Sequence, residues 1–468
     1  MRAHRAAIFT ACAATAVLAS LQCALATDLA LPQRVKRPAP IPVPAPAAAS
    51  SWTGFYVGGE LGIDAAAAKH VQPFSDAPDT SIGSVNRGPI GGAYGGFNYQ
   101  VLPWLVIGVE GAWSTSRAAY REFGEDFDSL ERSKFVSSVA GRLGFPIMPT
   151  TMVYAKAGPA WMDVRGVNGF GDNFNQTLQS VMFGAGIESL VTPNFAVRLE
   201  GTYTHATETL SLNDDNDEFH PDILQVMVGG AYKFDIPGLT PLGGAPASRP
   251  LPTKAPMLFT KAPAASAAVN WTGLEAGGFV SLNDDQMQYF GSNVGEDNEQ
   301  GPYANFRVGG GAFIGLNGQF SHVVLGVEAS ANLQKADFNV SNGVGFPPVF
   351  HFASIDSVYA LSLRVGWLVT PETLVYAKGG PAWIRVTPDA AYWNAIAPNP
   401  ATGAVTVNGY QYGGGIETYL TQNFSVRVEG MYTASQVAPG QLTFQAIPTP
   451  SQLKPSLLSA TLGAAVHF

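Results

Sequence analysis

Hydrophobic and polar positions alternate along many short segments of this chain, with a period of two residues. In FAVRLEGTYT (195–204) the odd positions are mostly apolar, while the even positions carry Arg198, Glu200 and Thr202. In VYAKAGPAWMDV (153–164) Lys156 stands between apolar residues in the same way. Successive side chains of a β-strand point to opposite faces. Such segments therefore predict strands with one apolar face and one face of polar or small residues.

Segments of this kind predict eight strands in each half of the chain. The first eight are expected near 52–63, 89–99, 104–116, 133–146, 152–165, 177–190, 195–208 and 222–234. The second eight are expected near 271–283, 304–317, 322–333, 355–369, 373–387, 404–420, 424–436 and 456–468.

The joints between these strands alternate between short and long. Long polar joints are expected at 64–88, 117–132 and 209–221, and short turns at Met148-Pro149-Thr150, Thr192-Pro193-Asn194, Thr370-Pro371-Glu372 and Thr421-Gln422-Asn423. One rim of tight turns opposite a rim of long loops is typical of a transmembrane β-barrel. We therefore predict an all-β fold of two tandem eight-stranded antiparallel transmembrane β-barrels.

The two halves repeat each other in sequence. VYAKAGPAWMDV (153–164) returns as VYAKGGPAWIRV (375–386), and GAGIESLVTPNFAVRLEGTYT (184–204) matches GGGIETYLTQNFSVRVEGMYT (413–433). A Pro/Ala-rich segment precedes each half, and such segments act as extended spacers. A single 16-stranded pore is the alternative, but it would join its eighth and ninth strands by a tight turn rather than by such a spacer.

The first residues resemble a secretory signal. Arg2 and Arg5 precede an apolar stretch, and Ala24-Leu25-Ala26 supplies a cleavage site after Ala26. We expect the chain to comprise a signal peptide (1–26), a periplasmic spacer (27–51), a first barrel (52–234), a linker (235–270) and a second barrel (271–468). Both cysteines, Cys12 and Cys23, lie in the signal, so the mature chain would have neither disulfides nor thiolate metal sites.

Composition narrows the class of protein further. Only 13% of the residues are charged and 52 are glycine, yet beyond the N-terminus there is no apolar run of the length that a membrane-spanning helix needs. The net charge is −9, which argues against nucleic acid as a partner, because phosphate binding needs a basic surface.

Charged residues recur at matching positions on the polar faces of both halves. The set comprises Glu110, Arg142, Lys156, Glu188, Arg198 and Glu200, and then Glu328, Arg364, Lys378, Glu417, Arg427 and Glu429. Buried charges must be paired, and three positive and three negative charges in each half can neutralise one another. We therefore predict a charge network inside each barrel. Glu60 and Arg307 are unmatched and are expected at the rims. A soluble sandwich or lipocalin-like barrel, with these charges in water, is the alternative.

Aromatic and proline positions complete the strand pattern. Trp161 is predicted to face outward at the membrane interface far from the tight turns. Pro159 lacks the N–H that a paired strand uses, so a bulge is expected near Gly158-Pro159. The last strand ends on Phe468.

These motifs together resemble the small alphaproteobacterial outer-membrane surface proteins, which have an OmpA-like eight-stranded barrel. The likeness rests on WTGFYVGGELG after a Pro/Ala spacer, GVEG, VYAKAGPAW, the GAGIE and VRLEG segments and the terminal phenylalanine. The chain departs from the family in carrying two barrels and in having Leu274-Glu275 where the first half has Phe55-Tyr56.

The resemblance implies a location in the cell outer membrane, among lipid and lipopolysaccharide, and insertion by the barrel-assembly machinery, which would read Phe468. It also implies surface exposure, a role in envelope integrity and contact of the loops with a host molecule or ligand, with haemin described for some relatives. Porin-like transport and a haemin receptor stay open as alternatives.

Catalytic and cofactor-binding motifs are not evident. The histidines after the leader, His70, His205, His220, His322, His351 and His467, share no local spacing with a partner carboxylate or serine. The acidic stretch NDDNDEFHPD (213–222) lacks the glycine and distal glutamate of a calcium loop. No enzyme activity, metal or cofactor is predicted.

Overall fold

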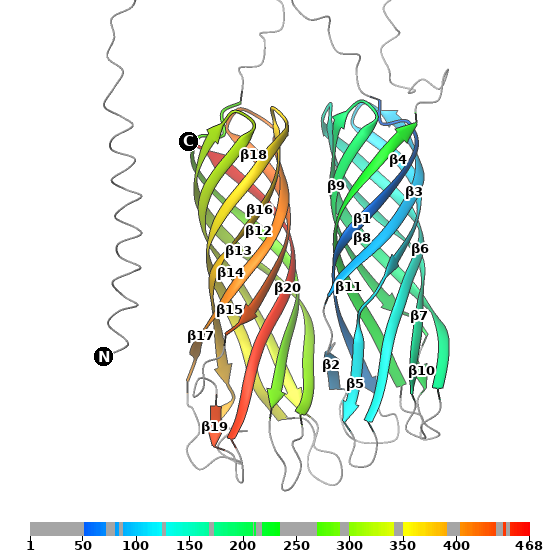
Figure 1. Ribbon diagram of the computed structural model, residues 1–468, viewed down its shortest axis with the longest axis vertical. Helices are drawn as coiled ribbons and strands as arrows, with labels where there is room; N and C mark the ends of the chain where they lie inside the picture. The colour runs from blue at the N-terminus through cyan, green and yellow to red at the C-terminus, as the bar shows by residue number, and fades with distance from the viewer. Residues whose placement is uncertain are drawn as a thin grey trace, which may run out of the picture. The chain divides into compact units, whose positions relative to one another are not determined.

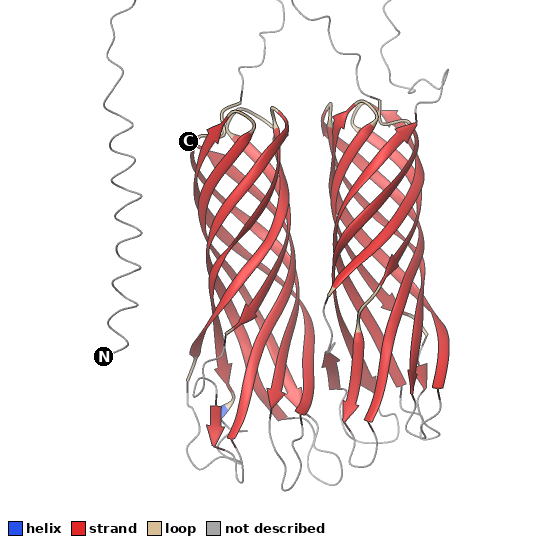
Figure 2. Ribbon diagram, viewed as in Figure 1, coloured by secondary structure: helices blue, strands red, loops and turns tan. Residues whose placement is uncertain are grey.

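The computed structural model describes residues 51–71, 80–83, 88–123, 128–167, 173–208, 210–211, 218–234, 269–290, 299–340, 350–390, 403–436, 443–445 and 450–468. Nearly all of these residues form β-strands, which are long and tilted (Figures 1 and 2). Among the described residues, no helix is both long and apolar enough to cross a membrane. The predicted leader with Ala26, and most of the spacer 27–51 and the linker 235–270, lie outside the described residues.

Eight long strands form the first barrel, together with three short ones. In chain order they are β1 (Gly54–Val71), β2 (Thr80–Gly83), β3 (Pro89–Leu102), β4 (Leu105–Thr115), β5 (Ala119–Phe123), β6 (Asp128–Met148), β7 (Thr151–Val167), β8 (Asn173–Thr192), β9 (Phe195–Ala206), β10 (Leu210–Ser211) and β11 (Glu218–Phe234). Each long strand pairs antiparallel with its neighbour, and β11 returns to β1, from Phe55↔Phe234 to Val71↔Glu218. The sheet therefore closes on itself.

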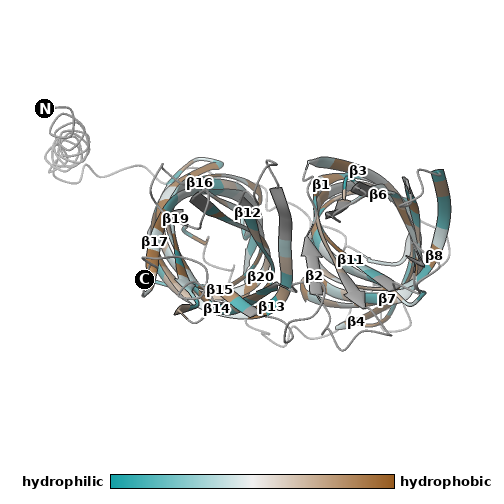
Figure 3. Cartoon of the chain, turned by 90° about the horizontal axis from the view of Figure 1, so that it is seen from below, coloured by the Kyte–Doolittle hydropathy of each residue, from teal (hydrophilic) through white to brown (hydrophobic). Residues whose placement is uncertain are grey.

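The second barrel repeats this arrangement. Its strands are β12 (Gly273–Phe290), β13 (Glu299–Phe320), β14 (Val323–Val340), β15 (Phe350–Thr370), β16 (Thr373–Pro388), β17 (Val405–Tyr419), β18 (Phe424–Ser435), β19 (Thr443–Gln445) and β20 (Pro450–His467). β20 pairs with β12, from Glu275↔His467 to Phe290↔Gln452. Because β1 pairs with β11 and β12 with β20, each eight-stranded set closes separately, and the single 16-stranded pore is excluded. Each ring is visible end-on in Figure 3.

The predicted strands are confirmed, but most of them extend further on the long-loop side. β6 begins at Asp128 and β15 at Phe350, whereas the hydrophobic pattern predicts starts at 133 and 355. The tight turns fall where they are expected, for example at 149–150 and 371–372. The strands are longer than the apolar pattern because hydrogen-bonded pairing between neighbouring strands continues beyond the residues with outward apolar side chains.

Pro159 does not produce the expected bulge. β7 and β8 pair without a register shift, and Pro159 lies opposite Val181. On its other side, pairing with β6 stops at Ala157 and resumes at Ala160 in the same register. The missing N–H therefore removes ladder bonds to one neighbour only. Side chains keep alternating through this region, and Trp161 points outward and is exposed.

Large apolar side chains cover the outside of both barrels. In β4, Ile107, Val109 and Trp113 are exposed while Val106 and Glu110 are buried. In β15, Leu361, Leu363 and Val365 are exposed in the same alternation. This arrangement turns apolar atoms toward the surroundings and polar ones inward, which is the reverse of a water-soluble sandwich. Hydropathy alternates along the strands in Figure 3.

Candidate functional site: the ionic lumens of the two barrels

The twelve charged residues expected to face inward are all buried in the structure. They lie on alternate residues of strands whose other face carries the exposed apolar side chains. In β7, for example, Tyr154 and Lys156 point inward while Ala155 and Ala157 are exposed.

In the first barrel, Lys156 links two carboxylates from different strands. Its Nζ lies 2.7 Å from Glu110 Oε1 and 2.6 Å from Glu200 Oε1. Arg198 contacts the same Glu110 through Nη1, at 2.8 Å from Oε2. Arg142 donates to Glu188. The charges thus form one connected layer rather than separate pairs.

Aromatic rings stack on the arginines of this layer. The Arg198 guanidinium lies 3.2 Å from the centre of the Tyr94 ring, and that of Arg142 lies 3.7 Å from the centre of the Tyr154 ring. The Tyr154 hydroxyl donates to Glu200 Oε2 at 2.7 Å. Cation–π contacts and charge-assisted hydrogen bonds together compensate for the loss of water around buried ions.

The second barrel reproduces the centre of this layer. Lys378 Nζ lies 2.7 Å from Glu328 Oε1 and 2.8 Å from Glu429 Oε1. Arg427 Nη1 lies 2.6 Å from Glu328 Oε2, and its guanidinium lies 3.2 Å from the centre of the Phe313 ring.

Arg364 completes the layer of the second barrel. Its guanidinium lies 3.7 Å from the centre of the Tyr376 ring. It donates to Glu417 and, at 3.1 Å, to Glu275 Oε1. The Tyr376 hydroxyl in turn donates to Glu429 Oε1 at 2.5 Å.

The expectation that Glu60 lies at the rim is wrong, and Glu275 also belongs to the network. Arg198 Nη2 lies 2.7 Å from Glu60 Oε2. Each layer therefore holds four carboxylates against three fixed cations, not three against three. Arg307, the other residue expected at a rim, is exposed.

A signal for these fourth carboxylates is present in the sequence. The first strands align as SWTGFYVGGELG and NWTGLEAGGFVS, in which Tyr56 and Glu60 match Glu275 and Phe279. The aromatic residue and the acid have exchanged places four residues apart. Because four is an even number, both positions share the inward face of the strand. Tyr56 donates to Glu110 Oε2 at 2.8 Å.

Strand glycine makes room for these rings. A Cβ atom built on Gly96 would lie 2.6 Å from the Tyr56 hydroxyl, and one on Gly186 would lie 2.7 Å from the Tyr154 hydroxyl. Neither ring could cross the lumen above a larger residue. The glycine-rich strands are therefore explained by a narrow interior.

The ionic layers are closed to water. No charged residue of either layer, Glu60 and Glu275 included, exposes more than 6% of its surface. A water-filled channel would wet the side chains that line it, so the interior at this level is packed, as in small eight-stranded barrels.

An apolar cluster lies inside each barrel on the loop side of the ionic layer. In the first barrel, inward residues Val136, Met162, Val164 and Leu178 pack together. In the second, the cluster includes Phe338, Phe352, Ile384, Val386 and Leu457. The pattern near Lys156 does not predict these clusters, because the polarity reverses along the strand: Met162 and Val164 lie on the inward face and Asp163 on the outward face.

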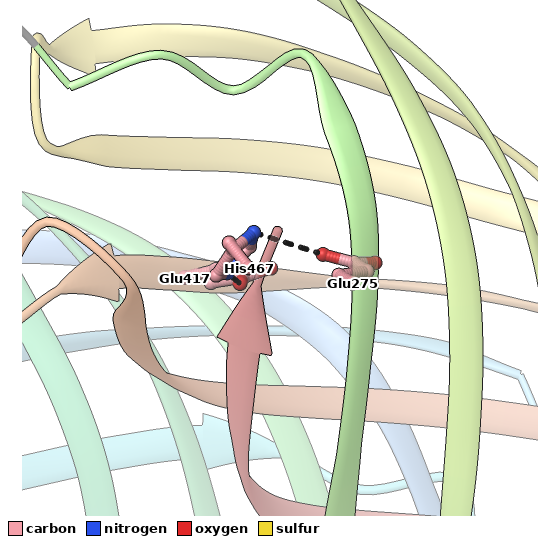
Figure 4. A group of neighbouring side chains, drawn as sticks. All are labelled: Glu275, Glu417 and His467. Atoms are coloured by element: carbon pink, nitrogen blue, oxygen red, sulfur yellow. Dashed lines mark hydrogen bonds and ion pairs between the residues drawn. The ribbon is translucent and has the colours of Figure 1, made fainter.

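The two barrels differ most at the turn-side mouth. Each has a buried tryptophan there, Trp52 or Trp271. The next-to-last residue of the first barrel is Lys233, which donates to the carbonyl of Ser51. The corresponding residue of the second barrel is His467. Figure 4 shows His467 lying between Glu275 and Glu417.

His467 contacts a serine as well as the two carboxylates. Its Nε2 lies 2.8 Å from Ser425 Oγ and 3.2 Å from Glu417 Oε1, and its Nδ1 lies 3.8 Å from Glu275 Oε2. Ser425 is fully buried, and its Oγ donates to Glu417 Oε1 at 2.5 Å. The hydroxyl proton is thus engaged away from the imidazole, so this group is not arranged as a nucleophile with its base.

The remaining candidate residues lie at or beyond the edges of the strands. His205 Nδ1 lies 2.6 Å from Asp222 Oδ1, and His351 Nε2 lies 3.9 Å from Asp337 Oδ1. The side chain of His70 and most of the acidic stretch 213–222 lie outside the described residues. Phe468 is exposed, and its N–H donates to Leu274 O at 2.8 Å.

Closed barrels with an apolar exterior and an ionic interior define an integral outer-membrane β-barrel protein. The sequence pattern of the family described as "Outer membrane protein beta-barrel domain" matches residues 41–234 and again 255–465, and the chain belongs to this family.

The relatives match less than half of this chain, which is about the length of one barrel. The chain is 28% identical over 238 residues to a 31 kDa outer-membrane immunogenic protein of Brucella melitensis, covering 47% of this chain and 98% of the relative. It is 30% identical over 187 residues to a 25 kDa outer-membrane immunogenic protein of Brucella abortus, covering 39% and 80%. A 22 kDa outer membrane protein of Rhizobium leguminosarum bv. viciae is 29% identical over 198 residues, covering 40% and 80%.

Solved structures give weaker matches. The Ail protein of Yersinia pestis is 19% identical, with a TM-score of 0.23, covering 39% of this chain and 99% of that one. OprG of Pseudomonas aeruginosa is 12% identical, with a TM-score of 0.31, covering 43% and 98%. The family match and the named relatives place the protein in the outer membrane, in contact with its lipid and lipopolysaccharide.

Proposed function

We propose that this protein is a structural and surface-display protein whose two barrels are separately sealed and do not conduct. One observation carries the proposal: each lumen is closed by its own ionic layer. A pore would be lined by wet side chains, whereas these are buried and bonded to one another. The apolar cluster on the loop side supports the same conclusion, because ions do not cross a dry apolar constriction without a large desolvation cost.

The roles of the chain segments follow from this proposal. Export would remove residues 1–26 after Ala26, and the Pro/Ala-rich segments 27–51 and 235–270 would lie on the periplasmic side as spacers. The domains would then be the barrels 52–234 and 271–468. The barrel-assembly machinery would read Phe468, which directly follows β20 and is exposed.

The long loops would contact molecules outside the cell. Two relatives are named immunogenic outer-membrane proteins, which supports exposure of the corresponding loops here. In this proposal envelope integrity depends on the barrels, and host contact depends on the loops.

Planar-bilayer recording of the purified, refolded mature protein tests the proposal. We expect no stable conductance steps on the nanosiemens scale, because neither lumen holds a continuous water path. Reproducible steps of that size would contradict it and favour transport. Omitting the refolding step provides a control for detergent leakage.

A further inference from the structure

The turn-side mouth of the second barrel combines three side chains that can bind a metal. Glu275, Glu417 and His467 each offer a ligand atom, and these atoms lie within 4.8 Å of one another. They come from three different strands, β12, β17 and β20, so the fold rather than local sequence brings them together (Figure 4). We propose that this group binds one divalent transition metal of the Zn²⁺ class.

The carboxylates are oriented toward the imidazole by Arg364. Glu417 Oε2 accepts a hydrogen bond from Arg364, and Glu417 Oε1 faces His467. Glu275 Oε1 accepts a hydrogen bond from Arg364 Nη1 at 3.1 Å, and Glu275 Oε2 lies 3.8 Å from His467 Nδ1. Glu275 thus presents Oε2 to His467 Nδ1, with a longer contact of 3.4 Å to Arg364. Glu417 Oε1, in contrast, accepts from Ser425 Oγ and orients the imidazole through Nε2. Ligating carboxylates commonly have such outer partners.

The imidazole is held with one nitrogen suited to a metal. The Ser425 hydroxyl proton is directed at Glu417, so His467 Nε2 is the donor toward Ser425 Oγ and Glu417 Oε1. In a neutral ring the lone pair then lies on Nδ1, the nitrogen facing Glu275. A ligating histidine usually donates its other N–H to a carboxylate in this way.

The distances lie close to those of an occupied site. Two ligands that bind Zn²⁺ at about 2.0–2.2 Å in tetrahedral geometry are separated by about 3.3–3.6 Å. His467 Nδ1 and Glu275 Oε2 are 3.8 Å apart, so they need to approach by only a few tenths of an ångström. His467 is further fixed by Tyr419, whose ring centre lies 4.4 Å from that of the imidazole.

A cavity reaches the site on the side of His467, and its lining includes neither Glu275 nor Glu417. It has a volume of about 400 Å³ and is lined by Trp271, Tyr419, Asn423 and His467, among others. Two protein ligands and a neighbouring carboxylate leave coordination positions that water from this cavity can fill, as in open zinc sites.

Ligand chemistry, rather than net charge, distinguishes the two barrels. Each ionic layer has four carboxylates and three fixed cations, so both leave one negative charge to be compensated. In the first barrel the positions of Glu275 and His467 are occupied by Tyr56 and Lys233, neither of which suits a zinc ligand at neutral pH. The proposed site therefore belongs to the second barrel.

The residues of the first barrel provide variants that suit the fold. The full mature protein, refolded in detergent, is dialysed against Zn²⁺ at pH 7.5 and its bound zinc is measured. Co²⁺ is then used to detect d–d absorption. We expect Glu275→Tyr and His467→Lys each to lose one equivalent of zinc relative to the wild type, while the heat-resistant fold is retained. Loop histidines contribute equally to all three proteins and cancel in the difference.

His467→Gln provides a second variant, of similar size and able to form hydrogen bonds, should a variant above fail to fold. The reciprocal Tyr56→Glu/Lys233→His protein is expected to gain one equivalent. Equal zinc content in the wild type and in every folded variant overturns the proposal. Stabilisation of the second barrel by acidification, without any response to Zn²⁺, also overturns it, because His467 would then bind a proton instead.

Discussion

The two barrels share an ionic centre but differ at one end. Lys156 and Lys378 make the same pair of contacts with glutamates, and Arg198 and Arg427 stack on an aromatic ring at the same distance of 3.2 Å. The mouths differ: Tyr56 and Lys233 in one barrel correspond to Glu275 and His467 in the other.

This difference indicates which parts of the interior the fold requires. The centre of the layer holds charges that have no access to water, so each one depends on its partners and both copies keep the same set. At the mouth of the second barrel a cavity adjoins His467, and on the first strand of each barrel the aromatic residue and the acid have exchanged places. The two barrels thus share the same centre and differ at the turn-side end.

The largest effects are expected from removing a stacked arginine. Arg198→Met leaves Glu60 and Glu110 without their shared cation, and Arg427→Met does the same to Glu328. Breaking a buried ion pair on one side costs about 3–5 kcal/mol. Peptide-resolved hydrogen exchange should show faster exchange in the substituted barrel only. Equal acceleration in both barrels would contradict independent closure.

Replacing the central lysines should have a slightly smaller effect. Lys156→Met or Lys378→Met removes a cation that bonds two carboxylates, and among the described residues no aromatic ring stacks on either lysine. We expect a loss of about 3 kcal/mol in the substituted barrel. The loss of heat-resistant migration on SDS gels at a lower temperature measures it. Because the contacts match, a much larger effect in one barrel would show that the two centres are not equivalent.

Tyr56→Phe tests the divergent mouth. It removes the hydroxyl that donates to buried Glu110, at a cost of about 1–3 kcal/mol. The second barrel has Glu275 at this position, so Glu275→Gln, which keeps a hydrogen-bonding group beside Arg364, is the matched comparison. Hydrogen exchange of β4 should respond to Tyr56→Phe. No change in that strand would mean that the hydroxyl does not stabilise the layer.

The smallest effects are expected on the outer face. Leu143→Ala and Val365→Ala shorten matched, exposed side chains. Lipid or detergent can fill the space that is left, so each should change the free energy of unfolding by about 0.5 kcal/mol or less. A loss of about 2–5 kcal/mol, as for a cavity in a packed core, would indicate that these residues face protein rather than lipid.

Much of this architecture could be predicted from the sequence, because the alternation within each strand and the internal repeat independently indicate which side chains face inward. The recurrence of Lys156 as Lys378 identifies an inward position independently of any partner. Glu60 and Glu275 could not be found by matching positions, since the acid and the aromatic residue had exchanged places. The apolar clusters around Met162 and Ile384 were missed because the polarity of the two faces reverses there, with Asp163 and Arg385 on the outward face.

Single-cysteine labelling tests the inside-out arrangement most directly, since the mature chain is expected to lack cysteine. Ala155 and Ala377 point outward from equivalent strands, while Ala160 and Ala382 point into the lumens. In liposomes, a lipid-soluble maleimide should label cysteines at 155 and 377, and a charged, water-soluble reagent should label none of the four. Labelling of 160 or 382 by the charged reagent would reveal a water-filled channel. Labelling of 155 or 377 by it would mean that the apolar faces do not lie in the membrane.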